Sequence, residues 1–106
     1  MESYVVVLIT APTEEAGDRI VAALVGQRLA ACVSRVPVRS TFLWQGSTSK
    51  EDEVLLIAKA RADTFACTFV PAVKAVHPYE VPEIIALPII MGNEEYLDWL
   101  ETELGA

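Results

Sequence analysis

The sequence predicts an α+β fold, in which one antiparallel four-stranded sheet carries two helices on one face and a third helix follows at the end. Three observations predict it. Apolar runs typical of strands alternate with patterns at helical spacing, in the order strand, helix, strand, strand, helix, strand. The chain has 106 residues, the length of one domain spanning residues 1–106. Its apolar residues make up 53% of the total, which is enough for a modest core.

The first predicted strand is Tyr4 to Ile9, a continuous apolar run rich in valine. Such a short run is typical of a central strand that is buried on both faces. Pro12 ends it, and Thr13 is a good N-cap for a helix to about Arg28, because two glutamates follow at the positive end of the helix dipole. The residues that recur at helical spacing are Ala16, Ile20, Ala23, Leu24 and Gln27.

The segment from Ala30 to Trp44 has the two-residue period of a strand. Pro37 lies inside it and indicates an edge strand or a bulge, because proline cannot donate a sheet hydrogen bond. The polar segment from Gln45 to Asp52 predicts a hairpin tip. Glu53 to Ala60 is the predicted return strand, which is partly apolar on both faces and therefore more buried than its partner.

A second helix follows, for which Asp63 is the predicted cap. Pro71 inside this helix would kink its axis, and His77-Pro78 ends it because a residue before proline avoids the helical region. Val81 to Ile90 is the last predicted strand, and Asn93 caps a short final helix. The apolar stripe of the second helix contains Phe65, Phe69, Ala72, Val73 and Val76. This βαββαβ order is the arrangement called ferredoxin-like.

The strand from Ala30 to Trp44 is long for so small a domain. At roughly 3.3 Å per residue it would measure ~50 Å if straight, whereas a domain of this size has a radius of gyration near ~13 Å. Either the hairpin bends back at Pro37, or it projects and pairs with another subunit. The high apolar content favours a homo-oligomer that pairs through hairpin edges.

Charge and cysteine content exclude several classes of protein. With 8 Lys or Arg against 15 Asp or Glu, the formal net charge is −7, so a nucleic-acid partner is not expected. Cys32 and Cys67 form neither a CxxC pair nor a zinc-finger spacing. The N-terminus lacks the basic region of a signal peptide, and the apolar runs are shorter than the ~20 residues of a membrane span. We therefore expect no membrane partner and a cytoplasmic protein with free thiols.

The most distinctive segment is His77 to Glu83, which reads His-Pro-Tyr-Glu-Val-Pro-Glu and contains the only histidine. Its two prolines fix φ and remove backbone donors, so the segment is a stiff, extended path. It holds an imidazole, a phenol and two carboxylates in a restricted geometry, and we expect the functional site here or beside it.

Several blocks together carry a family resemblance over nearly the whole chain: Arg28–Val33, Ser40–Trp44 with Gly46, Glu53 with Leu55–Lys59, His77–Ile84, Leu87–Ile89, and Gly92 with Tyr96–Trp99. They resemble the CutA family of divalent-cation-tolerance proteins. The resemblance implies a ferredoxin-like fold assembled as a tight homotrimer similar to PII signalling proteins, and a response to copper and other divalent cations without an organic cofactor.

The sequence departs from the family pattern at a few positions. The family often has tyrosine where Phe42 stands and threonine where Ala60 stands. Some bacterial members carry a further cysteine near the end of the first strand, where this chain has Thr10 and Ala11. A thiol-rich copper site of that kind is therefore not implied.

The candidate metal ligands are His77, Cys32 and Glu80, placed between subunits of a trimer. Copper(II) favours imidazole with oxygen or nitrogen ligands, whereas copper(I) favours thiolate. The alternative interpretation is that His77 caps the C-terminus of the second helix and Cys32 is a small core residue.

A second set of residues is a candidate for an inter-subunit cleft. Arg39, Ser40 and Lys59 are expected to line a cleft that binds a small anion, although all three also suit a solvated surface. Trp44 and Tyr79 are expected to be packing residues rather than stacking platforms.

Glu80 and Glu83 are candidates to accept hydrogen bonds across a subunit boundary from Lys59 or Arg61. They lie three residues apart on an extended segment, so they face opposite sides and do not suggest a catalytic pair. The sequence also lacks the GxSxG, Walker A and HExxH motifs, and we do not expect an enzyme.

Two functional hypotheses from different classes follow. In the first, the protein is a trimer that responds to metal ions and binds copper or another divalent ion weakly. In the second, it is a PII-like trimer that binds a small molecule or a protein partner at inter-subunit clefts, and its connection with metals is indirect.

Overall fold

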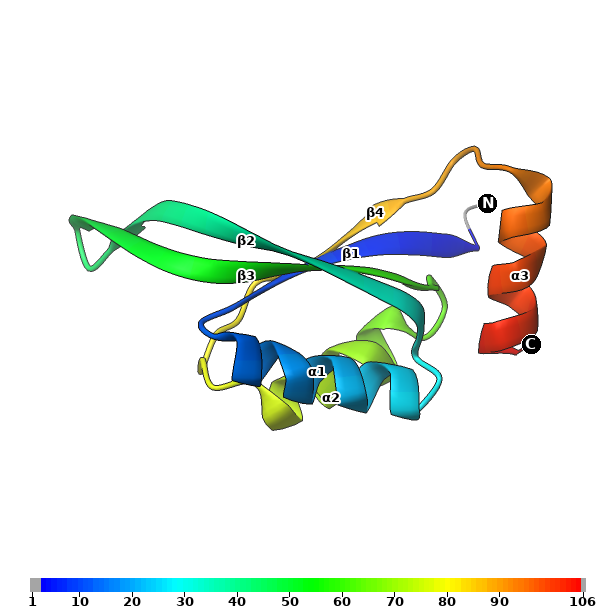
Figure 1. Ribbon diagram of the computed structural model, residues 1–106, viewed down its shortest axis with the longest axis horizontal. Helices are drawn as coiled ribbons and strands as arrows, with labels where there is room; N and C mark the ends of the chain where they lie inside the picture. Colours follow the sequence, from blue (N-terminus) through cyan, green and yellow to red (C-terminus); the bar gives the residue numbers. More distant parts are fainter. Residues whose placement is uncertain (1–2, 106) are drawn as a thin grey trace.

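The computed structural model of the protein describes residues 3–105 and shows an antiparallel four-stranded sheet with two helices packed on one face (Figure 1). The strands are β1 (Tyr4–Ala11), β2 (Ala30–Trp44), β3 (Ser47–Arg61) and β4 (Ile84–Pro88), in the sheet order β2-β3-β1-β4. The helices are α1 (Glu14–Gly26), α2 (Val70–Val76) and α3 (Glu94–Leu104), and the π-helical turn η1 (Phe65–Phe69) precedes α2. The predicted ferredoxin-like α+β fold is confirmed.

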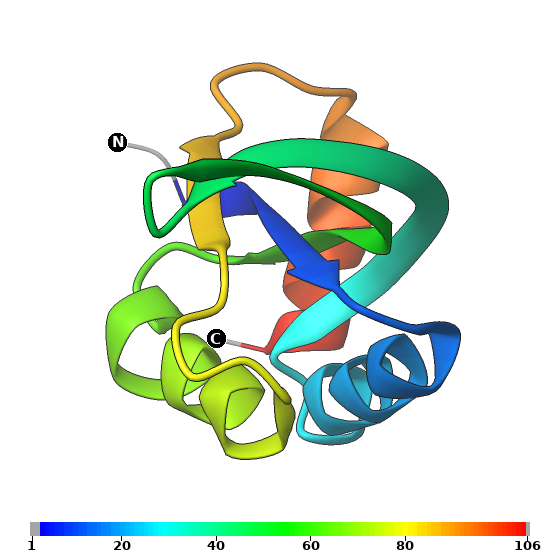
Figure 2. The same ribbon diagram turned by 90° about the vertical axis from the view of Figure 1, so that its left-hand side faces the viewer.

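The hydrophobic core lies between the sheet and the layer formed by α1 and α2 (Figure 2). Alternate residues of the central strand β1 point into it, and Val7 and Ile9 are fully buried. The intervening residues, such as Val6 and Leu8, are only half-buried. The prediction that this strand is buried on both faces is therefore wrong for the single chain, because no helix of the described residues covers the second face (Figure 1). We call this second face the open face.

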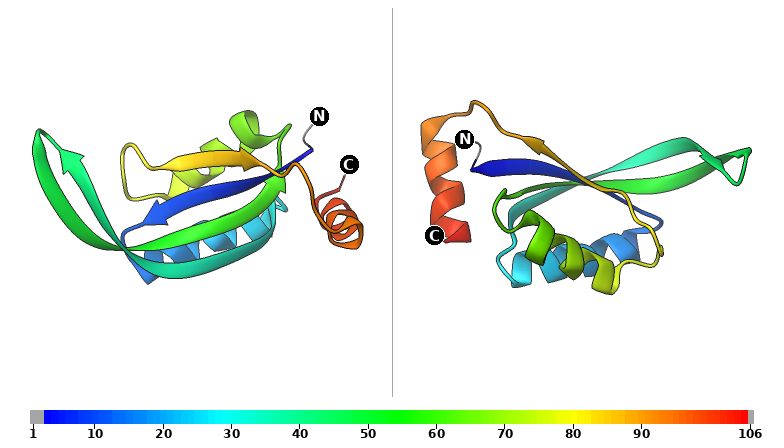
Figure 3. Two further views of the ribbon diagram at one scale, coloured as in Figure 1. Left: turned by 90° about the horizontal axis from the view of Figure 1, so that it is seen from above. Right: turned by 180° about the vertical axis from the view of Figure 1, so that it is seen from behind.

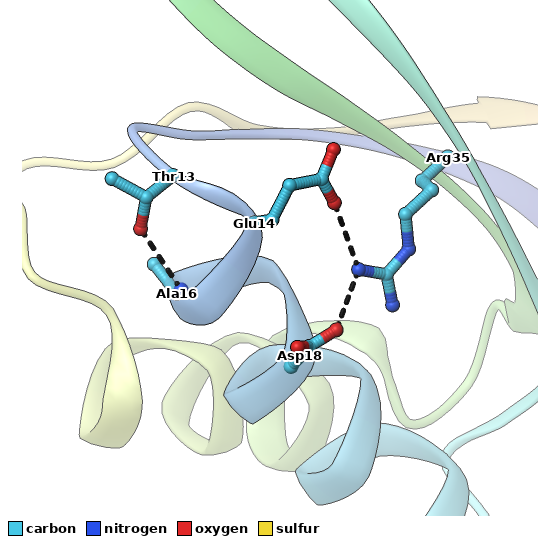
Figure 4. A network of polar contacts seen from close by, with 5 residues as sticks. All are labelled: Thr13, Glu14, Ala16, Asp18 and Arg35. Carbon is cyan, nitrogen blue, oxygen red and sulfur yellow. Dashed lines mark hydrogen bonds and ion pairs between the residues drawn. The ribbon is translucent and has the colours of Figure 1, made fainter.

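The N-terminal end of α1 is fixed by its cap and by an ion-pair network with β2 (Figure 4). Thr13 is the N-cap, as predicted, and its hydroxyl accepts a hydrogen bond from Ala16 N at 3.1 Å. Arg35 Nη1 donates to the carboxylates of Glu14 at 3.2 Å and Asp18 at 2.7 Å. These contacts hold the first turns of the helix against β2.

The hairpin of β2 and β3 has a tighter turn than predicted. Gln45 and Gly46 both have positive φ, at 50° and 81°, which is the geometry of a two-residue type I′ turn. The polar residues after them continue as strand β3, because both faces of the hairpin are exposed there and tolerate polar side chains. Pro37 lies on the edge strand β2, which confirms the first of the two predicted alternatives, an edge strand or a bulge. The register shift of β2 against β3 lies elsewhere, between Ala30 and Cys32.

The outer half of the hairpin projects from the body of the protein (Figures 1 and 3). Strand β1 ends opposite Val54, so the segments 38–44 and 47–53 pair only with each other. We call this two-stranded part the ribbon. The ribbon curves to one side as it leaves the sheet (Figure 3), and the molecule measures 44 × 25 × 23 Å. Of the two predicted paths, the chain takes the projecting one rather than bending back at Pro37.

The second helix begins differently from the prediction. Asp63 is not its cap, because its carboxylate pairs with Arg61 instead. The N-cap of η1 is Thr64, whose carbonyl accepts a hydrogen bond from Phe69 N, the i+5 donor of a π-turn, at 3.0 Å. This turn places Pro71 in the first turn of α2, a position that proline tolerates well.

The C-terminal elements follow the predicted order. Strand β4 is shorter than the predicted Val81 to Ile90, because the residues around Pro82 belong to the loop before it. Asn93 is the N-cap of α3, as predicted, and its side chain accepts a hydrogen bond from Glu95 N at 3.0 Å. Helix α3 lies across one end of the sheet, where Leu100 is fully buried (Figure 3). None of the helices within residues 3–105 is long and apolar enough to cross a membrane.

Candidate functional site

His77 is held in a fixed orientation where α2 ends. It is the C-cap residue of α2, and its own backbone N–H donates to Val73 O at 2.9 Å. The ring Nε2 lies 2.8 Å from Thr10 O, at the end of β1. The ring Nδ1 lies 3.0 Å from the backbone N of Tyr79, and accepts its hydrogen bond. Because a carbonyl only accepts and an N–H only donates, the ring is neutral with its proton on Nε2.

These contacts leave no free ring nitrogen for a metal ion. A histidine binds metal through a nitrogen lone pair, and the lone pair of Nδ1 is already engaged by Tyr79 N–H. The residue is also only 8% exposed. Coordination of a metal by His77 therefore requires a rearrangement of the loop around Tyr79.

The other two candidate ligands do not join His77 within one chain. Cys32 is half-buried on β2 opposite Lys59, and Glu80 is exposed in the loop before β4. Within residues 3–105 no group of three or more His, Cys, Asp or Glu side chains is arranged to hold a metal ion. The metal site of His77, Cys32 and Glu80 between subunits stays a prediction.

Tyr79 extends the contacts of His77 to the base of the ribbon. Its hydroxyl donates to Glu53 Oε2 at 2.8 Å, and its ring lies 5.0 Å from that of His77. Burial raises the pKa of Tyr79 to about 12, and the hydrogen bond to the Glu53 carboxylate acts in the same direction. Glu53 itself is 8% exposed. The loop is therefore pinned at two points, to Thr10 of β1 and to Glu53 of β3.

Glu53 and Thr10 are the residues of this network that the sequence does not single out as site residues. The sequence pattern places Glu53 only at the start of a strand, and Thr10 takes part through its backbone carbonyl, which no sequence pattern identifies. One sequence signal could have identified Glu53: it directly precedes the apolar run Val54 to Ala58. An acidic residue at the start of a core strand is unusual and suggests a specific partner.

The predicted cleft residues lie on three separate parts of the chain. Arg39 and Ser40 are on the ribbon, where Arg39 Nε forms an exposed ion pair with Asp52 at 3.2 Å. Lys59 is half-buried near the other end of β3, and Glu83 is exposed just before β4. The structure does not bring these residues together within one chain, and their inter-subunit cleft stays a prediction.

The surface beside the distinctive segment has a shallow hollow of about 230 Å³. Lys74 of α2 and Glu80 lie in its wall, with Val81 and Pro82 from the loop. A larger open hollow of about 430 Å³ lies between the end of α1 and α3, and Arg28 borders it. Both hollows are open to solvent, and neither contains His77 or Cys32.

Trp44 is expected to pack, yet it is 62% exposed at the tip of the ribbon in the single chain. The neighbouring Leu43 is 79% exposed. Side chains of this size gain about 1.5–3 kcal/mol when they are buried, so the tip of the ribbon is a costly apolar surface in the single chain.

Comparison with known proteins gives consistent matches over nearly the whole chain. Residues 5–103 match the family model described as CutA1 divalent ion tolerance protein. The divalent-cation tolerance protein CutA of Thermus thermophilus is 52% identical over 101 residues, covering 94% of this chain and 97% of that protein. The rice protein named CutA 1, chloroplastic, is 44% identical over 98 residues, covering 92% of this chain and 55% of that protein.

The solved structures agree with this match. The structure of the periplasmic divalent cation tolerance protein CutA from Archaeoglobus fulgidus superposes with a TM-score of 0.92 at 38% identity, covering 96% of this chain and 99% of that chain. The matched length, the identity and the shared fold all point to the same conclusion. The chain belongs to the CutA1 divalent ion tolerance protein family.

Proposed function

We propose that the protein acts as a homotrimer in the response to divalent metal ions. The observation that carries the trimer is the combination of an uncovered apolar sheet face with a projecting ribbon. The metal response is supported by the family and by the names of the relatives, which describe tolerance to divalent cations. Those names describe no reaction, and the proposal includes no catalytic step.

The open face has the composition of a buried interface. It lies opposite α1 and α2 and is lined by every second residue of the four strands. On β4, Ile85 is 50% exposed and Leu87 is 47% exposed. Contiguous apolar surface on a sheet indicates a protein interface. The residues that share this face include Val6, Leu8, Val36, Leu55, Ile57, Ile85 and Leu87.

The projecting ribbon is the second feature that supports an oligomer. Both of its strands have an outer edge without a partner among the described residues, and its tip carries Phe42, Leu43 and Trp44. Long exposed edges with apolar side chains promote pairing with another chain. A ribbon that reaches from one subunit onto the next would explain why the tip is apolar, and a ring of three such contacts would give the trimer that the family resemblance implies.

Direct copper binding through His77, Cys32 and Glu80 is a narrower proposal. It requires His77 to release the Tyr79 N–H, and it requires the other two ligands to come from neighbouring subunits. The present contacts of His77 therefore favour the second candidate, a PII-like trimer with a small molecule or protein partner in its clefts. In that case the effect of the protein on metal tolerance is indirect.

Native mass spectrometry with and without copper, under reducing conditions, tests both levels of the proposal. A trimer supports the assembly, whereas a monomer at micromolar concentration contradicts it. Stoichiometric copper that is lost in His77→Ala or Cys32→Ser, and kept in the matched control Cys67→Ser, supports the metal site. A trimer that stays free of copper would contradict the proposed metal site. The second candidate, binding at the inter-subunit clefts, would then be tested first with small anions.

The compartment is part of the proposal as well. We propose that the protein is cytoplasmic, on the ground that Cys32 and Cys67 are both free thiols. The relatives carry other names, periplasmic in Archaeoglobus and chloroplastic in rice. Detection of the protein in a periplasmic fraction, with a cytoplasmic marker absent from it, would contradict the assignment.

A further inference from the structure

One buried acid and one half-buried base lie on β3 without ionic partners. Glu53 is 8% exposed and is the only buried acidic residue within residues 3–105. Within residues 3–105 the ion pairs are formed by Arg35, Arg39 and Arg61. Neither Glu53 nor Lys59 takes part in one. Buried charges in proteins are normally paired, because an uncompensated charge in a poorly polar environment is costly.

Tyr79 does not compensate the charge of Glu53. Its hydroxyl donates one hydrogen bond to the carboxylate at 2.8 Å. Burial first, and Glu53 second, raise the pKa of Tyr79 to about 12, so the phenol keeps its proton and stays neutral. Glu53 is thus oriented by Tyr79 but still lacks a cation.

Glu53 and Lys59 cannot pair within one chain. Side chains of a strand alternate between faces, so Glu53, Leu55, Ile57 and Lys59 all point to the open face. Glu53 and Lys59 are six positions apart on an extended strand, a distance of ~20 Å. The two charges therefore lie near opposite ends of an apolar face.

We propose that Glu53 of one subunit forms an ion pair with Lys59 of a second copy of the chain when the open faces associate. The inference rests on the proposed homo-oligomer and adds the contact that fixes its register. Covering the face with another copy buries both charges further, which is tolerable only if they meet. An ion pair between Glu53 and Lys59 would compensate both charges in a single contact.

Charge complementarity selects a second copy as the occupant. A metal ion or a small amine at Glu53 would leave Lys59 unpaired, and an anion at Lys59 would leave Glu53 unpaired. A second copy brings the missing charge of each kind together with matching apolar side chains. Because the two charges are at opposite ends of the face, the contact can run head to tail and close a ring.

Charge reversal tests this pair in the full-length protein. Glu53→Lys and Lys59→Glu should each raise the subunit dissociation constant by about 100-fold, because each places like charges together in the interface. The double variant Glu53→Lys/Lys59→Glu should recover most of that loss. Native mass spectrometry over a dilution series measures the dissociation constant, and far-ultraviolet circular dichroism reports the fold of each variant.

The ion pair of Arg35 with Asp18 of α1, on the face of the sheet that the helices cover, provides the control. Reversal of either residue there should change the dissociation constant by less than about fivefold. If a reversed variant does not fold, the milder set Glu53→Gln, Lys59→Met and their combination supplies a double-mutant cycle.

The outcomes separate the pair from the assembly. A wild-type protein that is monomeric contradicts both the trimer and the pair. A wild-type oligomer in which the two reversals combine additively, without recovery in the double variant, overturns the pair and leaves the assembly intact. Recovery in a dimer rather than a trimer supports the pair and contradicts the trimer.

Discussion

The ring Nε2 of His77 lies 2.8 Å from the carbonyl oxygen of Thr10, which is 67 residues earlier in the chain. The contact joins the end of α2 to the end of β1, and through Tyr79 it continues to Glu53. A single imidazole thus satisfies a strand carbonyl with one nitrogen and a loop N–H with the other. The arrangement explains the histidine without any metal ion.

His77→Ala should therefore destabilise the protein even in the absence of metal. The substitution leaves Thr10 O and Tyr79 N without their hydrogen bonds and opens space in a buried position, at a cost of about 2–4 kcal/mol in the free energy of unfolding. Urea unfolding in the presence of a chelator measures this directly. A loss below about 0.5 kcal/mol would mean that these contacts contribute little to the fold.

Tyr79→Phe should remove one hydroxyl and leave the Glu53 carboxylate without its hydrogen bond. Because Glu53 is buried, we expect a loss of about 1–3 kcal/mol. Hydrogen exchange at the ribbon amides 47–53 should also become faster, since the loop no longer holds the base of the ribbon. The matched control is Tyr96→Phe, because the Tyr96 hydroxyl makes no hydrogen bond with the residues that the structure describes. Equal effects of the two variants would contradict the role of Tyr79.

Alkaline pH should destabilise the fold through Tyr79. Its pKa is raised to about 12 in the folded protein by burial and by Glu53, whereas an unfolded tyrosine titrates near ~10. The unfolded state therefore loses the phenol proton first, so the contribution is complete below pH ~10 and disappears as the pH rises to ~12. The difference in unfolding free energy between wild type and Tyr79→Phe should shrink over this interval. A constant difference would show that the phenol is not shifted.

Two glycine substitutions should have opposite effects. Gly46 has a φ of +81°, so Gly46→Ala strains the type I′ turn and should cost about 1 kcal/mol. Gly26 ends α1, and a Cβ atom at this position would meet no other atom within 4 Å, so Gly26→Ala should stabilise the protein by about 0.5–1 kcal/mol. Thermal unfolding of both variants measures the contrast, and the same sign for both would contradict the turn assignment.

The elements with the strongest sequence patterns were predicted closely. The bounds of β2 agree with the predicted Ala30 to Trp44, and both Thr13 and Asn93 are N-caps as predicted. In these cases the local pattern and the tertiary environment favour the same structure. Arithmetic on strand length left two paths for the hairpin, and the structure shows the projecting one.

The errors occur where tertiary contacts override local preference. The carboxylate of Asp63 could accept a hydrogen bond at a helix N-terminus, but it forms an ion pair with Arg61 of the preceding strand. The π-turn before α2 was not predicted, and it places Pro71 in the first turn of that helix. The polar composition after Gly46 predicts a loop, although an exposed ribbon tolerates polar side chains.

The segment chosen from the sequence as a candidate site is held by hydrogen bonds whose partners were not predicted. His77 and Tyr79 join this segment to β1 and β3 through side-chain hydrogen bonds. Its partners could not be predicted, because one is a backbone carbonyl of β1 and the other is a carboxylate at the start of an apolar run. Only the fold brings Thr10 and Glu53 to the same loop.

The two-residue turn at Gln45 and Gly46 also has a consequence for how the protein folds. All the pairs of β2 with β3, from Trp44 opposite Ser47 to Ala30 opposite Ala60, close outward from that turn without a long loop. The pairing of β1 with β4, in contrast, joins the two ends of the chain. Since closing a long loop costs more entropy, the hairpin should form early and β4 should dock last. The segment from His77 to Glu83 would then be ordered only in the final step of folding.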